Sequence, residues 1–131
     1  MFKIMPMKIN QKSMEPILFD GDYVLVTQKK KYNKGDIVVF KDKFDSKYKI
    51  KYIFAESNDW IDTSSALPKI IDNNNKNYLT KLTKLEYNTF YVLGYNEQMS
   101  KDSRHFGPIT CDQIIGKLIF RYYPFNSIRF F

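Results

Sequence analysis

The sequence predicts an all-β protein, and three observations support this class. Ten Tyr and eleven Phe residues accompany many Val and Ile residues, and such side chains pack well on a pleated sheet. The apolar runs are short and follow Gly-Asp turns, and one segment alternates between charged and apolar residues. We therefore expect a small coiled sheet or a partly open barrel.

The chain length bounds the domain organisation. A chain of 131 residues with 44% hydrophobic residues can bury one compact core. No internal repeat or linker is visible in the sequence. We expect residues 1–131 to form a single domain.

The first part of the chain contains an edge strand and two buried strands. Residues 7–13 are expected to form the edge strand, which runs into a loop that ends at Pro16. Two turns that contain Gly-Asp each begin a buried strand, and these strands span residues 23–27 and 37–40.

The next strand, over residues 47–54, alternates between lysines and apolar residues. Ile53 and Ala55 continue the face that carries the lysines, so this face changes from charged to apolar at Lys51. We expect Lys47 and Lys49 to lie toward solvent and Lys51 to lie at the border of the core.

The second half of the chain begins with a polar segment and ends with two more strands. A flexible loop is expected around residues 56–77, because Asp72–Asn77 is a polar, low-complexity run. Strands are expected over residues 89–94 and 114–123, with a bulge at Gly116.

The charge and the rare residue types exclude several functions. The net charge of +7 comes mainly from lysine, which argues against specific, arginine-based nucleic-acid readout but suits an anionic membrane surface or loose nucleic-acid attraction. The single cysteine, Cys111, excludes a disulfide framework and a cysteine-based zinc cluster, and His105 has no second histidine with which to bind a metal. We expect no metal and no cofactor.

The N-terminal segment is also informative. Residues 1–9 are apolar but interrupted by Pro6 and Lys8, and they are far fewer than the roughly 20 residues that span a bilayer. We expect neither a transmembrane helix nor a signal peptide in this segment.

Three groups of motifs carry candidate chemistry. Ser13-Met14-Glu15-Pro16, ahead of a Gly-Asp strand, places a serine in a short polar loop. The second motif is Tyr48–Ile53, which contains Lys51. The third group comprises Phe90–Asn96, Ser100–Arg104 and Phe106–Pro108.

These motifs resemble the type I signal peptidase family, membrane serine proteases that remove leader peptides from exported proteins. The family patterns are Ser-Met-x-Pro-Thr-Leu with Gly-Asp-x-Val-Leu-Val, then Tyr-Ile-Lys-Arg-Val-Val, then Phe-Val-Leu-Gly-Asp-Asn with Ser-x-Asp-Ser-Arg-x-x-Gly. Each motif alone is a weak signal, but here they follow one another in family order.

The resemblance implies a role for each matching residue. Ser13 takes the place of the nucleophile and Lys51 that of the general base. The Ser100 hydroxyl is expected to orient the Lys51 amine, while Asp102 and Arg104 form a structural pair. Asn96, in the Gly-Asp-Asn position, belongs to the same supporting element.

The oxyanion hole is only partly matched. The Ser13 backbone N–H is the expected first donor. Some family members carry a second donor, a serine, two positions before the nucleophile. Gln11 stands there in this chain, so its side-chain amide is the candidate second donor.

A lysine can act as a base only if it loses its proton. In water at neutral pH only about one lysine in a few thousand is neutral. Burial among apolar groups lowers a lysine pKa by several units, so the predicted dyad requires Lys51 to be buried.

The expected partner is a preprotein whose leader segment has small residues just before the cut. By resemblance the protein is membrane-associated, at the plasma membrane or an organellar inner membrane, with its site facing outward. Most family members carry N-terminal transmembrane helices, and we expect none in the few residues ahead of Ser13. We expect peripheral membrane binding through the aromatic tail, an anchoring partner subunit, or a soluble form that matures one dedicated substrate.

The sequence departs from the family patterns at two further places, and two alternative functions stay open. Tyr95 replaces the family's acid, and residues 54–58 replace the usual Gly-Leu-Pro-Gly-Asp. One alternative is a self-cleaving repressor-type Ser/Lys protease, although no helix-turn-helix precedes Ser13. The other is a basic β-barrel that binds nucleic acid or anionic lipid without catalysis.

Overall fold

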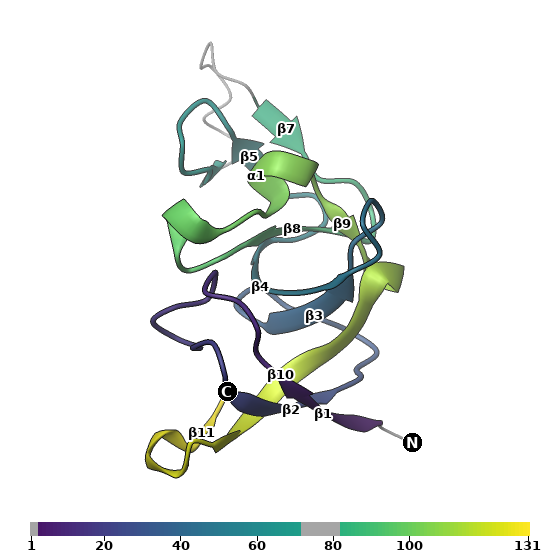
Figure 1. Cartoon of the computed structure of the whole chain (residues 1–131). Helices are drawn as coiled ribbons and strands as arrows, with labels where there is room; N and C mark the ends of the chain where they lie inside the picture. The colour runs from purple at the N-terminus through teal and green to yellow at the C-terminus, as the bar shows by residue number, and fades with distance from the viewer. Residues whose placement is uncertain (1–2, 72–81) are drawn as a thin grey trace.

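The computed structural model describes residues 3–71 and 82–131, and it confirms the predicted all-β class. Two antiparallel sheets account for most of its regular structure, and they are open sheets that do not close into a barrel. The smaller sheet lies at the end of the molecule away from β1, β2 and both termini (Figure 1).

The larger sheet places its strands in the order β1-β2-β10-β3-β4-β8-β9, and β11 pairs with β10. The strands of this sheet are β1 (Ile4–Lys8), β2 (Tyr23–Thr27), β3 (Ile37–Lys41), β4 (Tyr48–Ala55), β8 (Thr89–Leu93), β9 (Ile109–Thr110), β10 (Ile114–Tyr123) and β11 (Arg129–Phe130). The strands predicted from residue 23 onward therefore agree with the structure to within a residue or two at each end.

The edge strand differs from the prediction. It was expected over residues 7–13 but spans Ile4–Lys8. After Lys8 the chain separates from β2. The last two hydrogen bonds between these segments run from the Ile9 N–H to the Asp22 carbonyl and from the Gly21 N–H to the Ile9 carbonyl. This exit frees residues 10–18 to form the turn that carries Ser13.

The smaller sheet takes two of its three strands from residues 56–77, where a loop was expected. Its strands, in the order β6-β5-β7, are β5 (Trp60–Asp62), β6 (Lys69–Ile71) and β7 (Leu82–Lys84). Ile61 explains the difference, because it is fully buried against Ala55, Leu85 and Leu93 and anchors β5. The polar run Asp72–Asn77 lies outside the described residues.

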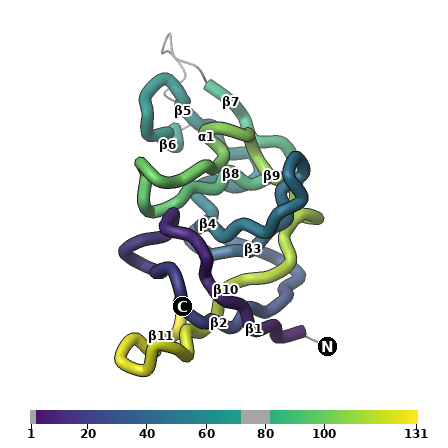
Figure 2. Tube along the Cα trace, viewed as in Figure 1, coloured from purple at the N-terminus to yellow at the C-terminus, as the bar shows by residue number. Residues whose placement is uncertain are grey.

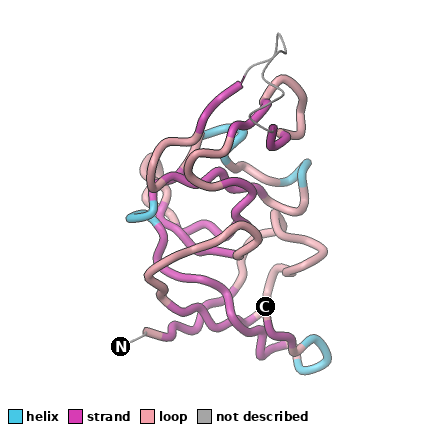
Figure 3. The backbone as a smooth tube through the Cα atoms, turned by 180° about the vertical axis from the view of Figure 1, so that it is seen from behind, coloured by secondary structure: helices cyan, strands magenta, loops and turns pink. Residues whose placement is uncertain are grey.

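The helical segments are short and lie at the periphery, as Figure 3 shows. Among the described residues they are α1 (Ser103–Phe106) and the 3-10 turns η2 (Glu97–Met99), η3 (Cys111–Gln113) and η4 (Phe125–Ser127). Asp102 caps α1 by accepting a hydrogen bond from the Arg104 N–H. The cap places the Asp102 carboxylate at the end of β8.

Strand β3 is buried on both faces, which explains its continuous apolar run. Ile37 and Val39 pack in one core cluster with Val24, Val26 and Leu118. The alternate residues Val38 and Phe40 pack in a second cluster, whose other members include Ile53, Phe90, Val92 and Ile109. The sheet thus coils so that its centre is covered from two sides.

Strand β10 crosses β2 closely at Gly116. The register shifts between Ile114 and Gly116, which agrees with the predicted bulge. A Cβ atom at Gly116 would lie 2.5 Å from Cγ1 of Val26 and 2.9 Å from the Thr27 carbonyl oxygen. Only glycine allows this close approach of the two strands.

Arg121, on β10, joins three distant segments. Its guanidinium donates to the carbonyls of Ile17 and Ser127 and forms an ion pair with the buried Asp22 at 3.1 Å. Ile17 belongs to the turn after Ser13, so Arg121 fixes that turn and the C-terminal tail against the same strand.

Candidate active site

A compact turn presents Ser13 at the edge of the core. The N–H groups of Ile17 and Leu18 both donate to the Met14 carbonyl at 2.9 Å. Met14 and Leu18 are fully buried in the first core cluster. Because these two side chains anchor the turn, the Ser13 hydroxyl is held in place by packing.

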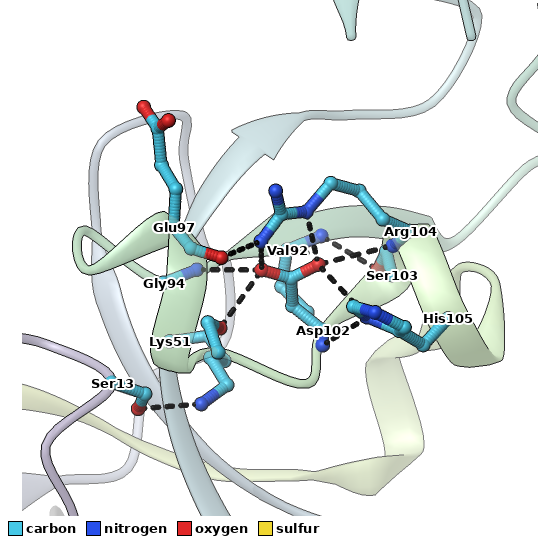
Figure 4. Close-up of polar contacts among 10 residues, drawn as sticks. Ser13, Lys51, Val92, Gly94, Glu97, Asp102, Ser103, Arg104 and His105 are labelled. Carbon is cyan, nitrogen blue, oxygen red and sulfur yellow. Dashed lines mark hydrogen bonds and ion pairs between the residues drawn. The ribbon is translucent and has the colours of Figure 1, made fainter. Parts of the chain in front are cut away.

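The structure brings Ser13 and Lys51 together, although they are 38 residues apart in the chain. Figure 2 shows the loop between β1 and β2 reaching alongside β4, which carries Lys51. The Lys51 Nζ lies 2.6 Å from the Ser13 Oγ, within a buried hydrogen bond (Figure 4). This distance suits proton transfer between a nucleophile and a base.

Lys51 is 1% exposed, which is deeper than the border position expected from the sequence. On β4 it lies directly opposite Val38, a member of the second core cluster. Burial lowers the pKa of Lys51 to about 8; the negative charge of Asp102 opposes this shift and the positive charge of Lys49 adds to it. About one Lys51 side chain in ten is then neutral at pH 7.

Lys49 does not lie toward solvent, as was expected for it and as Lys47 does. Its side chain is 13% exposed and forms ion pairs with Asp42 and, at 3.2 Å, with Asp45. The two carboxylates compensate the charge of Lys49, so it tolerates a half-buried position two residues from Lys51.

Asp102 is the centre of the supporting network. Its carboxylate is fully buried and accepts hydrogen bonds from the Arg104 guanidinium at 2.9 and 3.0 Å, from the Gly94 N–H at 3.0 Å and from the Ser100 hydroxyl at 2.8 Å. Figure 4 shows the Arg104 side chain folded over the carboxylate. Burial alone would raise the pKa of Asp102, but these hydrogen bonds outweigh it and hold the pKa below the ordinary value.

Ser100 lies beside this network but does not make the expected contact. Its hydroxyl donates to Asp102, and within residues 3–71 and 82–131 no hydrogen bond joins it to Lys51. The Asp102 carboxylate is the stronger acceptor for the Ser100 proton, because the Lys51 amine is largely protonated at pH 7 and then has no lone pair to offer.

Asn96 ties the supporting element to the nucleophile turn. Its backbone N–H donates to the Ser13 carbonyl at 2.8 Å, and its side-chain amide donates to the Lys12 carbonyl at 3.1 Å. Asn96 thus binds the peptide carbonyls on both sides of Ser13.

Gly94 also belongs to the site, although no role was expected for it. A Cβ atom there would lie 2.2 Å from the Ser100 Oγ and 2.7 Å from the Ser13 carbonyl oxygen. The glycine therefore lets β8, Ser13 and Ser100 meet at one point. Its match to the glycine of the family's Gly-Asp-Asn pattern was the available signal.

Ser103 was also missed as a separate contributor. Its hydroxyl accepts a hydrogen bond from the buried Val92 N–H at 2.8 Å and so fixes α1 against β8. Its place as the second serine of the Ser-x-Asp-Ser-Arg pattern was the available signal, although the sequence alone does not show that its hydroxyl binds the Val92 N–H.

Gln11 and the dyad line one open cleft with a volume of about 450 Å³. A second cavity of about 190 Å³ adjoins it, with an apolar lining that includes Met7, Ile9, Val39 and Ile50. Gln11, Asn10 and Lys49 line both. His105 and Cys111 are outside the cleft, and among the described residues no group of His, Cys, Asp and Glu side chains is placed to hold a metal.

Comparison with known proteins identifies the family. The family described as "Signal peptidase, peptidase S26" matches residues 1–66 and 62–123. The chain belongs to this family. The expected enzyme class, a serine peptidase of signal peptidase I type and hence a hydrolase, is confirmed.

Individual signal peptidases are similar over nearly the whole chain. Signal peptidase IB of Staphylococcus aureus is 31% identical, and the match covers 98% of this chain and 83% of that protein. Signal peptidase I of Bacillus caldolyticus is 30% identical, with 93% and 81% covered. These similarities favour the peptidase over a basic barrel without catalysis.

The fold is also shared with a solved structure. A signal peptidase I from Enterococcus faecalis superposes with a TM-score of 0.55, at 17% identity, over 70% of this chain and 99% of that one. At this identity the match speaks for the fold alone. The signal peptidase I family is membrane-associated. Within the described residues, no helix has the length and hydrophobicity needed to cross a membrane.

The burial of Lys51 leads to a prediction about stability. Lowering the pKa of Lys51 from 10.5 to about 8 means that burial of this lysine costs about 3 kcal/mol of stability below pH 8, where it is charged in both the folded and the unfolded state. Lys51→Met should therefore raise the free energy of unfolding at pH 7 by about 1–3 kcal/mol, measured by urea titration. The unfolded state binds more protons, so the wild type gains stability between pH 8 and 10.5 and the difference should shrink there.

The matched control is Lys69→Met, because Lys69 is an exposed lysine on β6. This change should leave the free energy of unfolding within about 0.5 kcal/mol of the wild type, both at pH 7 and between pH 8 and 10.5. A Lys51→Met protein that is less stable than the wild type at pH 7 would contradict a lysine pKa lowered by burial.

Proposed function

We propose that this protein is a Ser/Lys endopeptidase that cleaves leader peptides from exported preproteins. The observation that carries the proposal is the 2.6 Å contact between the Ser13 hydroxyl and a Lys51 amine that is 1% exposed. Membership of the signal peptidase family supports the substrate class.

The proposed reaction has two stages. The neutral Lys51 amine accepts the Ser13 proton as the Ser13 Oγ attacks the scissile carbonyl. The tetrahedral species collapses to an ester on Ser13, and the Lys51 ammonium returns the proton to the leaving amine. In the second stage Lys51 deprotonates water, and the water oxygen attacks the ester carbonyl. The bond to Ser13 Oγ then breaks, the Lys51 ammonium returns the proton to that oxygen, and the leader's carboxyl group is released with Ser13 and the neutral amine restored.

Asp102, Arg104, Ser100 and Asn96 are proposed to position this dyad and take no part in proton transfer. Arg104 neutralises Asp102, so Asp102 holds Lys51 in its charged form less strongly. Asn96 fixes the peptide that carries Ser13. A fixed nucleophile and base save the entropy of bringing them together in each turnover.

The Ser13 N–H and the Gln11 amide are proposed as the oxyanion donors. Both residues line the cleft that holds the dyad, and donors aimed at the developing oxyanion stabilise the tetrahedral species. The adjoining cavity of about 190 Å³ supports the expected preference for small residues before the cut.

An extended substrate is proposed to add a strand to the enzyme. Strand β1 is an edge of the larger sheet, and the chain continues from it through residues 9–12 to Ser13. Main-chain hydrogen bonds to such an edge would align the scissile carbonyl with the hydroxyl.

The first test is cleavage of a leader-bearing preprotein. Ser13→Ala and Lys51→Met should each lower kcat/KM by at least about a thousandfold, because each removes one half of the dyad, as followed by gel analysis of the cleaved product. Ser65→Ala and Lys69→Met, both exposed and outside the cleft, should cleave like the wild type. Unchanged cleavage by either dyad variant, with its fold retained, would exclude that residue's role.

The second test is the pH dependence of cleavage. Because the neutral amine is the reactive form and the pKa of Lys51 is about 8, kcat/KM should rise about tenfold per pH unit below pH 8 and level off above it. Single-turnover rates between pH 5.5 and 9.5 measure this limb. A rate that is independent of pH, or one that still rises tenfold per unit at pH 9.5, would contradict Lys51 as the base.

We also infer that the C-terminal tail contacts a membrane surface. Phe125 is 78% exposed and Phe130 79% exposed, so these rings do not belong to the core. Arg129 lies between them in the chain, over the Phe131 ring. Exposed aromatics combined with cations suit the lipid headgroup region.

Vesicle cosedimentation tests this contact. The Phe125→Ser/Phe130→Ser protein should bind anionic vesicles about tenfold more weakly than the wild type, since each ring loses apolar burial in the membrane. Phe44→Ser is the matched control, because Phe44 is 84% exposed but lies in the β3–β4 connection. Equal binding by all three proteins would remove the tail from the proposal.

A further inference from the structure

Lysines outnumber carboxylates in the cleft around the dyad. Five lysines and two aspartates line it, and they are Lys12, Lys47, Lys49, Lys51, Lys101, Asp20 and Asp45. Two of the lysines are already accounted for, because Lys51 contacts Ser13 and Lys49 is paired with Asp42 and Asp45.

The other three lysines form a rim with uncompensated charge. Lys12, Lys47 and Lys101 are exposed, and within the described ranges 3–71 and 82–131 no ion pair involves them. We call these three residues the lysine rim. Asp20 is the one carboxylate in the described lining that is not engaged in an ion pair.

The lysine rim comes from three separate segments. Lys12 immediately precedes Ser13, Lys101 immediately follows Ser100, and Lys47 immediately precedes β4, the strand of Lys51. The cleft that all three line also contains Ser13 and Lys51. A peptide held for attack by Ser13 therefore lies in a cleft that carries positive charges from three separate segments.

We propose that the lysine rim selects peptide substrates that carry acidic side chains within a few residues of the scissile bond. The inference rests on the proposed function and adds a charge preference to it. A net charge of +7 on the whole chain acts in the same direction, because it attracts acidic segments before contact.

Solvent limits the size of the preference. An exposed ion pair changes an equilibrium by less than about fivefold, so three lysines around one acidic substrate residue give a preference on the order of tenfold. Charges in such a cleft are screened within about 10 Å at 0.1 M salt and within about 3 Å at 1 M salt. The preference should fall as salt is added.

The cleft favours an acidic peptide over a nucleic acid, the other common polyanion. Single-stranded nucleic acids bind where basic grooves also offer aromatic side chains for base stacking. Among the described residues, the lining of this cleft includes no aromatic side chain. The apolar cavity of about 190 Å³ beside it suits a side chain of a peptide instead.

The test uses a pair of leader-type peptides that differ in charge alone. One carries Asp on each side of the small-residue cleavage motif and the other carries Asn at the same places. The wild type should cleave the Asp peptide about tenfold more efficiently, by kcat/KM, at 50 mM salt, and about twofold more efficiently at 500 mM salt.

Charge reversal assigns the preference to the rim. Lys12→Glu, Lys47→Glu and Lys101→Glu should each reduce the ratio of the two kcat/KM values by about threefold. Lys29→Glu, an exposed lysine outside the cleft with the same change in net charge, should keep the ratio of the wild type. If Lys29→Glu lowered the ratio equally, the preference would come from the overall charge of the protein, and the proposed role of the lysine rim would be wrong.

Binding to Ser13→Ala separates this inference from the proposed function. Fluorescence anisotropy with labelled peptides reports binding without turnover. Equal cleavage and equal binding of the two peptides would overturn the charge preference and leave the peptidase intact. Tighter binding of the Asp peptide, without cleavage of either peptide by the wild type, would support the rim and overturn the proposed function. If a 12-nucleotide single-stranded nucleic acid displaced the Asp peptide, the proposal that the cleft favours an acidic peptide over a nucleic acid would be wrong.

Discussion

The buried carboxylate of Asp102 is the group on which the arrangement of the site depends. It is fully buried, and its oxygens accept hydrogen bonds from Arg104, Ser100 and Gly94, which come from a helix, a loop and the end of a strand. A buried charge is tolerated only if such donors surround it. The segments that supply the donors must therefore keep fixed positions relative to one another. Asn96 lies between Gly94 and Ser100 in the chain, and its hydrogen bond to the Ser13 carbonyl fixes Ser13 relative to the same segments.

Arg104 also determines what Asp102 does to the proposed base. The negative charge of Asp102 raises the pKa of Lys51, against the larger effect of burial. A carboxylate without a partner would hold Lys51 in its charged form more strongly. Arg104 binds both carboxylate oxygens, so the site keeps an acid that organises its backbone while limiting the acid's effect on the lysine. Lys49 adds a second positive charge and lowers the pKa of Lys51 further.

The sequence predicted those parts of the structure that depend on short-range patterns. The strands over residues 23–27 and 114–123 follow from β-branched and aromatic runs after turns, and Lys51 was assigned to a face that becomes apolar at that residue. The burial of Ile61, which turns an expected loop into a sheet, depends on long-range contacts with Leu85 and Leu93. The Ser100 hydroxyl could not be assigned to Asp102 from sequence, because a choice between two acceptors depends on distances that only the fold sets.

Gly94 shows how the fold and the site constrain each other. Strand β8 ends at the preceding residue, Leu93, and Gly94 must donate its N–H to Asp102 while leaving room for the Ser100 hydroxyl and the Ser13 carbonyl. Any side chain would separate these groups, since even a Cβ atom would lie 2.2 Å from the Ser100 Oγ. The absence of a side chain at one position therefore sets the distance between the nucleophile turn and the buried carboxylate. The 2.6 Å contact of Ser13 with Lys51 depends on that distance as much as on either side chain.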